Sequence, residues 1–263
     1  MRRQCMIANY HTHTWRCNHA FDTEREYVEA AVARGIKTLG FADHAPYFFD
    51  EGHVSNLRMT LEEYPNYVAQ LLQLREEYAG KIDILIGLEM EYYPKYFEKT
   101  LEYCLTHGLD YIIMGQHCLD HTESWQAHMP AQDEALVACY VDRVLEGAAT
   151  GAYTYIAHPD HFKFAGDEKI WLRHMERMCL GLKEMNVPVE MNLLGFAENR
   201  HYPRRDFFEI VKSVGNTVVM GCDAHSKAQM GNVDAARRAK AWLCDIGITP
   251  VESLQVAKPA LIR

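Results

Sequence analysis

Short apolar runs alternate with longer stretches of mixed polarity along most of the chain. Each run is too short for a core helix and leads directly into polar residues, which is typical of a buried strand. We predict seven such strands, at residues 6–8, 37–42, 82–88, 111–115, 153–157, 187–191 and 217–220. The stretches between them carry helix start and stop signals. We predict helices at about residues 22–32, 60–79, 94–108, 132–149, 167–185, 206–214 and 232–246.

This alternation predicts an α/β protein with a parallel sheet and helices outside it. Side chains with coordinating or acid–base chemistry follow every predicted strand. A closed βα barrel gathers such groups at the carboxyl ends of its strands, whereas an open sheet would place a ligand at one switch point. Contributions from all the strands favour the barrel. Because no linker or internal repeat interrupts the pattern, we expect residues 1–263 to form a single domain.

Charge and composition exclude several classes of protein. The net charge of −9 gives no support to a nucleic-acid polymer as partner. The eight cysteines form no CxxC pair, so reduced thiols in a cytoplasmic protein are the simplest account. The apolar run after Arg2 and Arg3 is too short for a signal peptide, and no stretch reaches the ~18 apolar residues of a membrane span. We expect a cytoplasmic protein with no membrane partner, acting as a monomer or homodimer.

Three histidines follow the first predicted strand: His11, His13 and His19. Side chains at i and i+2 lie on the same side of an extended strand, so His11 and His13 can point at one spot. His19 can fold back from the loop that follows. Neutral imidazole is the commonest protein metal ligand. The cluster therefore indicates either a metal site or an ordinary His-rich loop.

Later strand ends supply further candidate ligands. They are Asp43 or His44, Glu89, His117, His158, Asp223 and His225. A single catalytic zinc takes about three protein ligands, so the full set indicates two or three divalent ions that share a bridging carboxylate. Two ions ~3.5–4 Å apart can clamp an in-line displacement at phosphorus. Mixed nitrogen and oxygen ligands suit Zn, Fe or Mn.

These residues stand in motifs that resemble those of one known family. The motifs are His11-x-His13-x5-His19, Phe41-Ala42-Asp43-His44, Gly87-Leu88-Glu89, Gly115-x-His117, Ala157-His158-Pro159-Asp160 and Asp223-Ala224-His225-Ser226. In this order they resemble the motif set of the polymerase and histidinol phosphatase (PHP) superfamily. The chain length, the Cys17-Asn18-His19-Ala20 continuation and the HPD stretch are most similar to the histidinol-phosphate phosphatase branch.

The resemblance implies a distorted (β/α)7 TIM-like barrel of PHP type that holds three divalent metal ions. It implies that His11, His13, Glu89 and Asp223 bind one ion, that His19, His44 and His225 bind a second, and that Glu89, His117 and His158 bind a third, with Glu89 bridging. It also implies a phosphomonoesterase of histidine biosynthesis. In such an enzyme a metal-activated hydroxide attacks the phosphorus of L-histidinol phosphate, a small phosphorylated substrate, and releases L-histidinol and phosphate.

Six residues outside the metal set are candidates for other roles. Asp160 is a candidate to protonate the leaving alkoxide or to orient the attacking water, or else a turn residue after a proline. Arg200 is a candidate bidentate clamp on the phosphate, which guanidinium geometry suits. Arg16 competes for that role, as do Arg204 and Arg205. His161 is either a substrate contact or a loop residue.

The sequence leaves other functions open. After Asn192 the branch usually continues with a Thr-x-Gly-x-Arg type of sequence, whereas this chain has the run Leu193-Leu194-Gly195-Phe196. That departure keeps open a phosphoesterase acting on nucleotides or another small phosphate ester. A metal-dependent C–N hydrolase also uses an HxH start on a barrel, but it often uses a lysine bridge, and no lysine follows a predicted strand here. A metal-binding module without activity would be expected to lose ligands that this chain retains.

Overall fold

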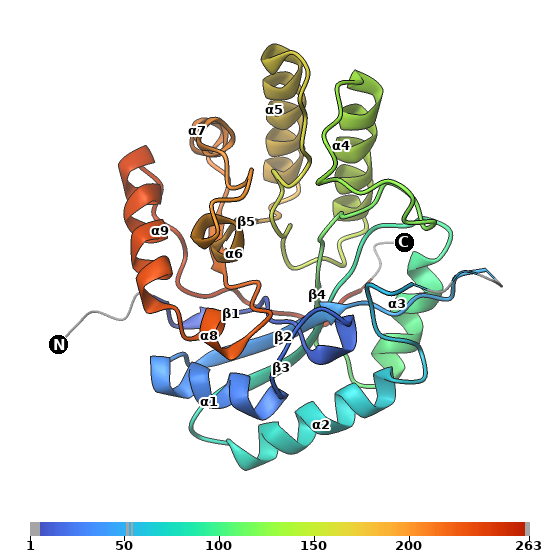
Figure 1. Ribbon diagram of the computed structural model, residues 1–263, viewed down its shortest axis with the longest axis vertical. Helices are drawn as coiled ribbons and strands as arrows, with labels where there is room; N and C mark the ends of the chain where they lie inside the picture. Colours follow the sequence, from blue (N-terminus) through green and yellow to red (C-terminus); the bar gives the residue numbers. More distant parts are fainter. Residues whose placement is uncertain (1–5, 51–52, 54, 261–263) are drawn as a thin grey trace.

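Parallel strands curl through the middle of the molecule, and helices lie outside them (Figure 1). The computed structural model describes residues 6–50, 53 and 55–260. Arg2 and Arg3, after which the sequence predicts no signal peptide, lie outside the described residues. One sheet has four strands in the order β1 (Ala8–Asn9), β2 (Thr38–His44), β3 (Asp83–Glu89) and β4 (Tyr111–Ile113). A second sheet pairs β5 (Val189–Asn192) with β6 (Val218–Gly221). Every pairing is parallel, so the predicted α/β class with a parallel sheet is confirmed.

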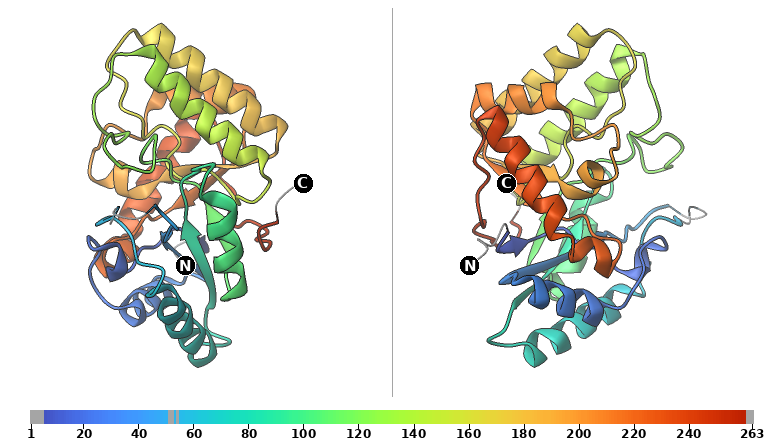
Figure 2. Two further views of the ribbon diagram at one scale, coloured as in Figure 1. Left: turned by 90° about the vertical axis from the view of Figure 1, so that its right-hand side faces the viewer. Right: turned by 60° about the vertical axis from the view of Figure 1, so that its left-hand side comes forward.

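The long helices connect the strands and surround the sheet (Figure 2). They are α1 (Glu24–Arg34), α2 (Tyr64–Glu77), α3 (Phe97–Thr106), α4 (Glu134–Ala149), α5 (Glu168–Glu184), α7 (Arg205–Val214) and α9 (Val233–Ile246). Each coincides with a predicted helix to within a few residues. Before α2, Thr60 and Glu63 exchange hydrogen bonds as in a capping box, but the helix begins only at Tyr64 rather than at residue 60 as predicted. None of the described helices combines the length and the apolar composition that a membrane crossing needs.

Three short elements were not predicted: η1 (Trp15–Cys17), α6 (Leu193–Ala197) and α8 (Lys227–Met230). Each begins shortly after a strand end, at a residue whose side chain accepts a hydrogen bond from a backbone N–H of the new turn. Those residues are Thr14, Asn192 and Ser226. Such side chains favour helix starts, so the short elements shape the loops at the carboxyl ends of the strands.

The predicted strand at residues 153–157 is reduced to single bridges. Ile156 bridges Met114 on one side and Val189 on the other, and so joins the two sheets. Backbone bonds run from Ile156 N to Pro188 O at 3.0 Å and from Glu190 N to Ile156 O at 2.9 Å. On the Val189 side the ladder ends in one direction because Pro188 has no N–H to donate. It ends in the other because His158 N donates to the side chain of Glu190 rather than to a backbone carbonyl. The prediction of seven regular strands is therefore corrected. A four-stranded sheet and a two-stranded sheet are joined by isolated bridges, at Ile156 on one edge and from Thr12 to Ala224 on the other.

A small apolar cluster fills the space that the strands enclose. It consists of Ala8, Tyr10, Ala42, Tyr111, Ile113, Tyr155, Ala157 and Val219, which come from both sheets and from the bridging segment. The Tyr111 hydroxyl donates to Tyr10 O at 2.7 Å. Gly40 and Gly87 leave room for the Tyr111 ring, since a Cβ on either would overlap it. This packing holds the strands in a curl, which brings their carboxyl ends together.

Candidate metal centre

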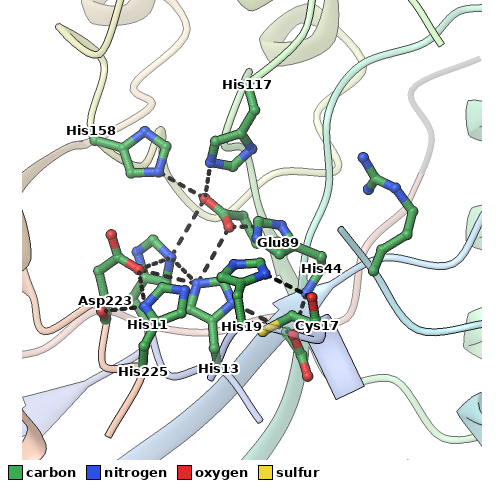
Figure 3. Close-up of polar contacts among 12 residues, drawn as sticks. His11, His13, Cys17, His19, His44, Glu89, His117, His158, Asp223 and His225 are labelled. Carbon is green, nitrogen blue, oxygen red and sulfur yellow. Dashed lines mark hydrogen bonds and ion pairs between the residues drawn. The ribbon is translucent and has the colours of Figure 1, made fainter. Parts of the chain in front are cut away.

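All nine predicted ligands converge at the carboxyl ends of the strands, as the side chains labelled in Figure 3 show. His44 and Glu89 are the last residues of β2 and β3 and are paired in register. The others lie in the segments that follow the strands: His11, His13, His19, His117, His158, Asp223 and His225. Parallel strands end at one edge, so residues far apart in the sequence meet there.

Glu89 lies in the middle of this group (Figure 3). Its Oε1 is 2.9 Å from His158 Nε2 and 3.5 Å from His117 Nε2. Its Oε2 is 3.2 Å from His44 Nδ1 and 3.5 Å from His13 Nε2. The carboxylate is only 1% exposed. One buried carboxylate thus faces imidazoles from four different segments, which is the arrangement a bridging ligand needs.

Asp223 faces the two histidines of the HxH motif. Its Oδ1 is 3.1 Å from His13 Nε2 and 3.5 Å from His11 Nε2. The two Nε2 atoms are 3.2 Å apart, and that of His11 is 3.5 Å from Glu89 Oε1. These four side chains therefore surround a common point.

His19, His44 and His225 form a second group, with one ring nitrogen from each within 4.8 Å of the others. His19 Nδ1 lies 2.7 Å from Cys17 O, and His225 Nδ1 lies 3.0 Å from Asp223 O. A carbonyl oxygen only accepts hydrogen bonds, so each Nδ1 carries the proton and each Nε2 keeps its lone pair. The two imidazoles are therefore in the tautomer that a metal requires.

Glu190 is a contact residue that the sequence analysis missed. It is fully buried, and its Oε1 is 2.8 Å from His11 Nδ1. Its Oε2 accepts hydrogen bonds from His158 N at 3.0 Å and from Asn192 Nδ2 at 2.8 Å. A carboxylate in this position fixes the ring orientation of a ligating histidine. The available signal was its spacing of two residues from Asn192, which puts both on one side of β5.

Asp43 and Glu91, which are not in the ligand set, contact the Nδ1 atoms of two ligand histidines, His13 and His117. Asp43 Oδ1 is 3.5 Å from His13 Nδ1, which supports His44, rather than Asp43, as the ligand that this motif supplies. Glu91 Oε1 is 3.3 Å from His117 Nδ1, and Glu91 is only 1% exposed. Burial would raise the pKa of Glu91, but Arg58 and His117 lower it to about 2.

The imidazoles and carboxylates of the centre shift one another's pKa values. Burial alone would lower the pKa values of His11 and His13, but the neighbouring carboxylates, including Glu89 and Asp223, raise both well above the ordinary value. Burial alone would raise the pKa values of Glu89 and Asp223, but the surrounding imidazoles hold both well below the ordinary range. The carboxylates are therefore ionised, as metal ligands must be.

Several buried atoms of the centre lack a hydrogen-bond partner among the described residues. Two of them, Nδ1 of His44 and Oε2 of Glu89, face the centre. Leaving such a buried group unpaired costs about 1–3 kcal/mol. Divalent cations remove that cost, because imidazole nitrogens and carboxylate oxygens crowded around common points are the ligands they prefer. The residues present therefore fit bound divalent ions.

Two of the nine candidate ligands have left-handed backbone conformations, with φ of 29° at His158 and 49° at Asp223. Residues other than glycine rarely adopt positive φ, and such strain gathers at functional sites. Gly115 shows the crowding in another way, since a Cβ there would overlap the Glu89 carboxylate. The local backbone is thus shaped around the ligands rather than around regular structure.

A cavity of about 400 Å³ opens over the centre. Besides six of the ligand histidines and both ligand carboxylates, it is lined by Phe21, His161, Leu194, Arg200, Tyr202, Ser226 and Gln229. His161 is buried, and its Nδ1 has no hydrogen-bond partner among the described residues. Arg200 is about two-fifths exposed; it pairs with Glu198 at 2.7 Å and donates to the Tyr202 hydroxyl at 3.2 Å. Two of the three predicted substrate contacts, Arg200 and His161, thus border the cavity.

Asp160 and Arg16 are not among the residues that line the cavity in the described part of the chain. Asp160 is buried, and its Oδ2 accepts a hydrogen bond from Arg204 N at 2.5 Å. Arg16 is buried as well, and its guanidinium pairs with Glu24 and donates to the side chains of Asn66 and Gln70 at 2.9 Å each. Both residues are therefore engaged in contacts with other parts of the protein.

Comparison with known proteins gives concordant results. The family model described as "PHP domain" matches residues 9–194. A Deinococcus radiodurans protein named "Probable histidinol-phosphatase" is 29% identical over 241 residues, which cover 86% of this chain and 88% of that protein. A Bacillus subtilis histidinol-phosphatase is 30% identical over 128 residues, which cover 43% of this chain and 48% of that protein.

Among solved structures, histidinol phosphate phosphatase from Lactococcus lactis, in complex with zinc, L-histidinol and phosphate, is similar to this chain with a TM-score of 0.71. The identity is 18%, and the alignment covers 96% of this chain and 99% of that one. At this identity the likeness shows a common fold.

Proposed function

The chain belongs to the PHP domain family, and on that premise we propose that it is a metal-dependent phosphomonoesterase whose substrate is L-histidinol phosphate. The observation that carries the proposal is the position of Glu89, a buried carboxylate that faces imidazoles from four segments and has an oxygen without a hydrogen-bond partner among the described residues. The named relatives support both the reaction class and the substrate.

We propose three divalent ions, held by the three ligand groups that the PHP resemblance implies, with Glu89 common to two of them. The short distances from Glu89 to His117 and His158 support the third group. Divalent ions in such a site supply Lewis acidity, which neutralises phosphoryl charge and makes water nucleophilic at neutral pH. Zinc in the Lactococcus lactis structure supports zinc as one candidate, beside iron and manganese.

The residues of the chain would bind and orient the substrate. Arg200, the one arginine among the described residues that line the cavity, would contact the phosphoryl oxygens. Phe21 and Leu194 offer apolar surface to the leaving group, and His161 lines the same cavity. Burial raises the pKa of Asp160 to about 7, which suits a proton donor near neutral pH, but Asp160 lies outside the cavity lining and its Oδ2 accepts a hydrogen bond from Arg204 N.

The fold and the setting complete the proposal. We propose that the isolated bridges at Ile156 and at Thr12 close the strands into the distorted (β/α)7 barrel that is implied by the resemblance. All the described cysteines are free, which supports the reducing cytoplasm as its location. We propose that the protein acts as a monomer or a homodimer, as expected from the sequence.

The test is an assay of the purified protein for bound metal and for phosphate release from L-histidinol phosphate, beside nucleoside monophosphates. We expect release from histidinol phosphate, and a loss of about 10–100-fold in kcat/KM for Arg200→Met, because a charge-assisted bidentate contact is worth about 1.5–3 kcal/mol. Arg205→Met, at an exposed arginine of α7, is the matched control. Turnover of nucleotides alone would refute the biosynthetic substrate while leaving a metal phosphatase.

A further inference from the structure

Arg58 is a buried cation that lies outside the ligand group. Only 4% of its surface is exposed. Its Nη1 is 3.0 Å from Glu91 Oε2 and its Nη2 is 3.1 Å from Glu91 Oε1, so the pair is bidentate. Nη1 also donates to Ala45 O at 3.3 Å. A buried arginine with this geometry is held firmly in one position.

The same guanidinium joins two long loops. It belongs to the loop between β2 and α2, and it donates to Glu123 Oε1 through Nη2 at 2.6 Å and through Nε at 3.0 Å. Glu123 belongs to the loop between β4 and α4, and Ser55 Oγ donates to it at 3.0 Å. Arg58 therefore ties both loops to Glu91, which follows β3.

Glu91 passes this constraint on to His117. Its Oε1 is 3.3 Å from His117 Nδ1, while His117 Nε2 is 3.5 Å from the Glu89 carboxylate. If Nδ1 donates its proton to Glu91, then Nε2 presents a lone pair to the centre. The backbone of Glu91 is also fixed, because its carbonyl accepts from the Tyr47 hydroxyl at 2.6 Å.

We propose that Arg58 is a positioning residue, which acts through Glu91 to hold His117 in the tautomer and orientation that bind a metal ion. The inference rests on the proposed metal centre but concerns residues that neither the ligand set nor the comparisons include.

A rival role for Glu91 is direct metal ligation. Oxygen and nitrogen atoms of His44, Glu91 and His117 lie within 4.8 Å of one another, which is compatible with an ion. The contacts of Arg58 favour positioning instead, because its guanidinium engages both Glu91 oxygens. The two roles predict opposite effects of removing Arg58. If Arg58 positions Glu91, its removal weakens metal binding; if Arg58 competes with a metal ion for Glu91, its removal strengthens metal binding.

The test measures the release of zinc from the zinc-loaded protein to an excess of chelator, without reference to turnover. In Arg58→Met we expect one metal equivalent to leave about 10–100-fold faster, the range typical of lost outer contacts to a metal ligand. Glu91→Gln should have a similar effect. The double variant should be no faster than the faster single variant, because both changes break the same chain of contacts.

Two further variants separate positioning from general damage. Arg58→Lys keeps a buried cation but not the bidentate fork, so it should fold if Arg58→Met does not, and should release the same equivalent at an intermediate rate. Arg75→Met breaks the ion pair of Arg75 with Asp110 at the other end of the strands and should release zinc as the unaltered protein does. Histidine ¹⁵N spectra of the metal-free proteins should show the Nδ1–H form of His117 lost in Glu91→Gln.

Each outcome decides the matter. Release from the Arg58 variants at the unaltered rate, or more slowly, overturns the inference and leaves the proposed function standing. Equal acceleration in Arg75→Met assigns the effect to lost stability and also overturns it. An unaltered protein that binds no divalent ion overturns the inference together with the proposed function.

Discussion

At the scale of single residues, Glu89 has more contacts with the candidate ligands than any other side chain described for the centre. His158, His117, His44 and His13 each have a ring nitrogen within 3.5 Å of it. It reaches them because it ends β3, in register with His44 at the end of β2. A change at this one position should therefore disturb more than one ion.

Glu89→Gln should lower both the metal content and phosphatase activity. The amide keeps the shape but removes the charge that faces five imidazoles, those of His11, His13, His44, His117 and His158. We expect a loss of activity greater than the roughly 10–100-fold that outer contacts contribute, measured with elemental analysis and a phosphate-release assay. Glu176→Gln, at an exposed position of α5, is the control. Full metal content with full activity in Glu89→Gln would contradict a bridging role.

Asp160 should make stability depend on pH in an identifiable way. Burial raises its pKa to about 7, above the ordinary value of 3.8, so the folded protein favours the protonated carboxyl. Its contribution to the free energy of unfolding is complete below about pH 4 and is lost as the pH rises through about 7.

Asp160→Asn removes this titration. Each pKa unit is about 1.4 kcal/mol, so between pH 5.5 and 8 the variant should gain about 2 kcal/mol relative to the unaltered protein in urea unfolding. The reversed trend, with the variant losing stability relative to the unaltered protein at high pH, would show that the carboxylate form is the one stabilised in the fold.

At the scale of elements, several helices begin at a side-chain cap, although α2, α3 and α7 do not. Asp133 and Asp167 accept hydrogen bonds from backbone N–H groups two residues later, at 2.9 and 2.8 Å, at the starts of α4 and α5. The short helices α6 and α8 begin in the same way, at Asn192 and Ser226. The caps on the long helices lie outside the centre, whereas those on the short helices help to form it.

Asp167→Ala should lower the free energy of unfolding by about 1 kcal/mol, the usual cost of losing an N-cap. Activity should be unchanged, because Asp167 lies outside the cavity lining. The measurement is urea unfolding with a parallel activity assay. Glu176→Ala, in the middle of α5, should change stability by no more than about 0.5 kcal/mol. Equal losses in the two variants would argue against a capping role.

At the scale of the whole molecule, the centre joins the two sheets. Glu89 and His44 come from the four-stranded sheet, while Asp223 follows the two-stranded one. The sheets meet through single bridges at Ile156 and at Thr12 rather than through full ladders. Ions that bind groups from both sheets should therefore stabilise the fold as a whole.

Removal of metal should lower the thermal stability and abolish activity together. A ligand at 100 times its dissociation constant stabilises the folded state by about 2.7 kcal/mol. We expect chelation to lower the melting temperature, and added zinc, iron or manganese to restore both properties, measured by calorimetry and phosphate release. An unchanged melting temperature after complete removal of metal would exclude a role for the ions in joining the sheets.

The positions of the long helices, the parallel strands and the ligand motifs follow from the sequence by itself, because hydrophobic periodicity and residue spacing are local properties. His11 and His13 share a face by alternation alone. Glu89 is a candidate by its place after an apolar run, and the family resemblance selects it as a ligand. The contact of Glu190 with His11, the burial of Glu91 and the Arg58 network depend on segments far apart in the chain. Only the tertiary structure decides them, because the curl of the sheets sets which strand ends meet. The same holds for the irregular strand at residues 153–157. There the neighbouring Pro188 has no N–H to donate and His158 N donates to the Glu190 side chain, so Ile156 makes only a single bridge to Val189.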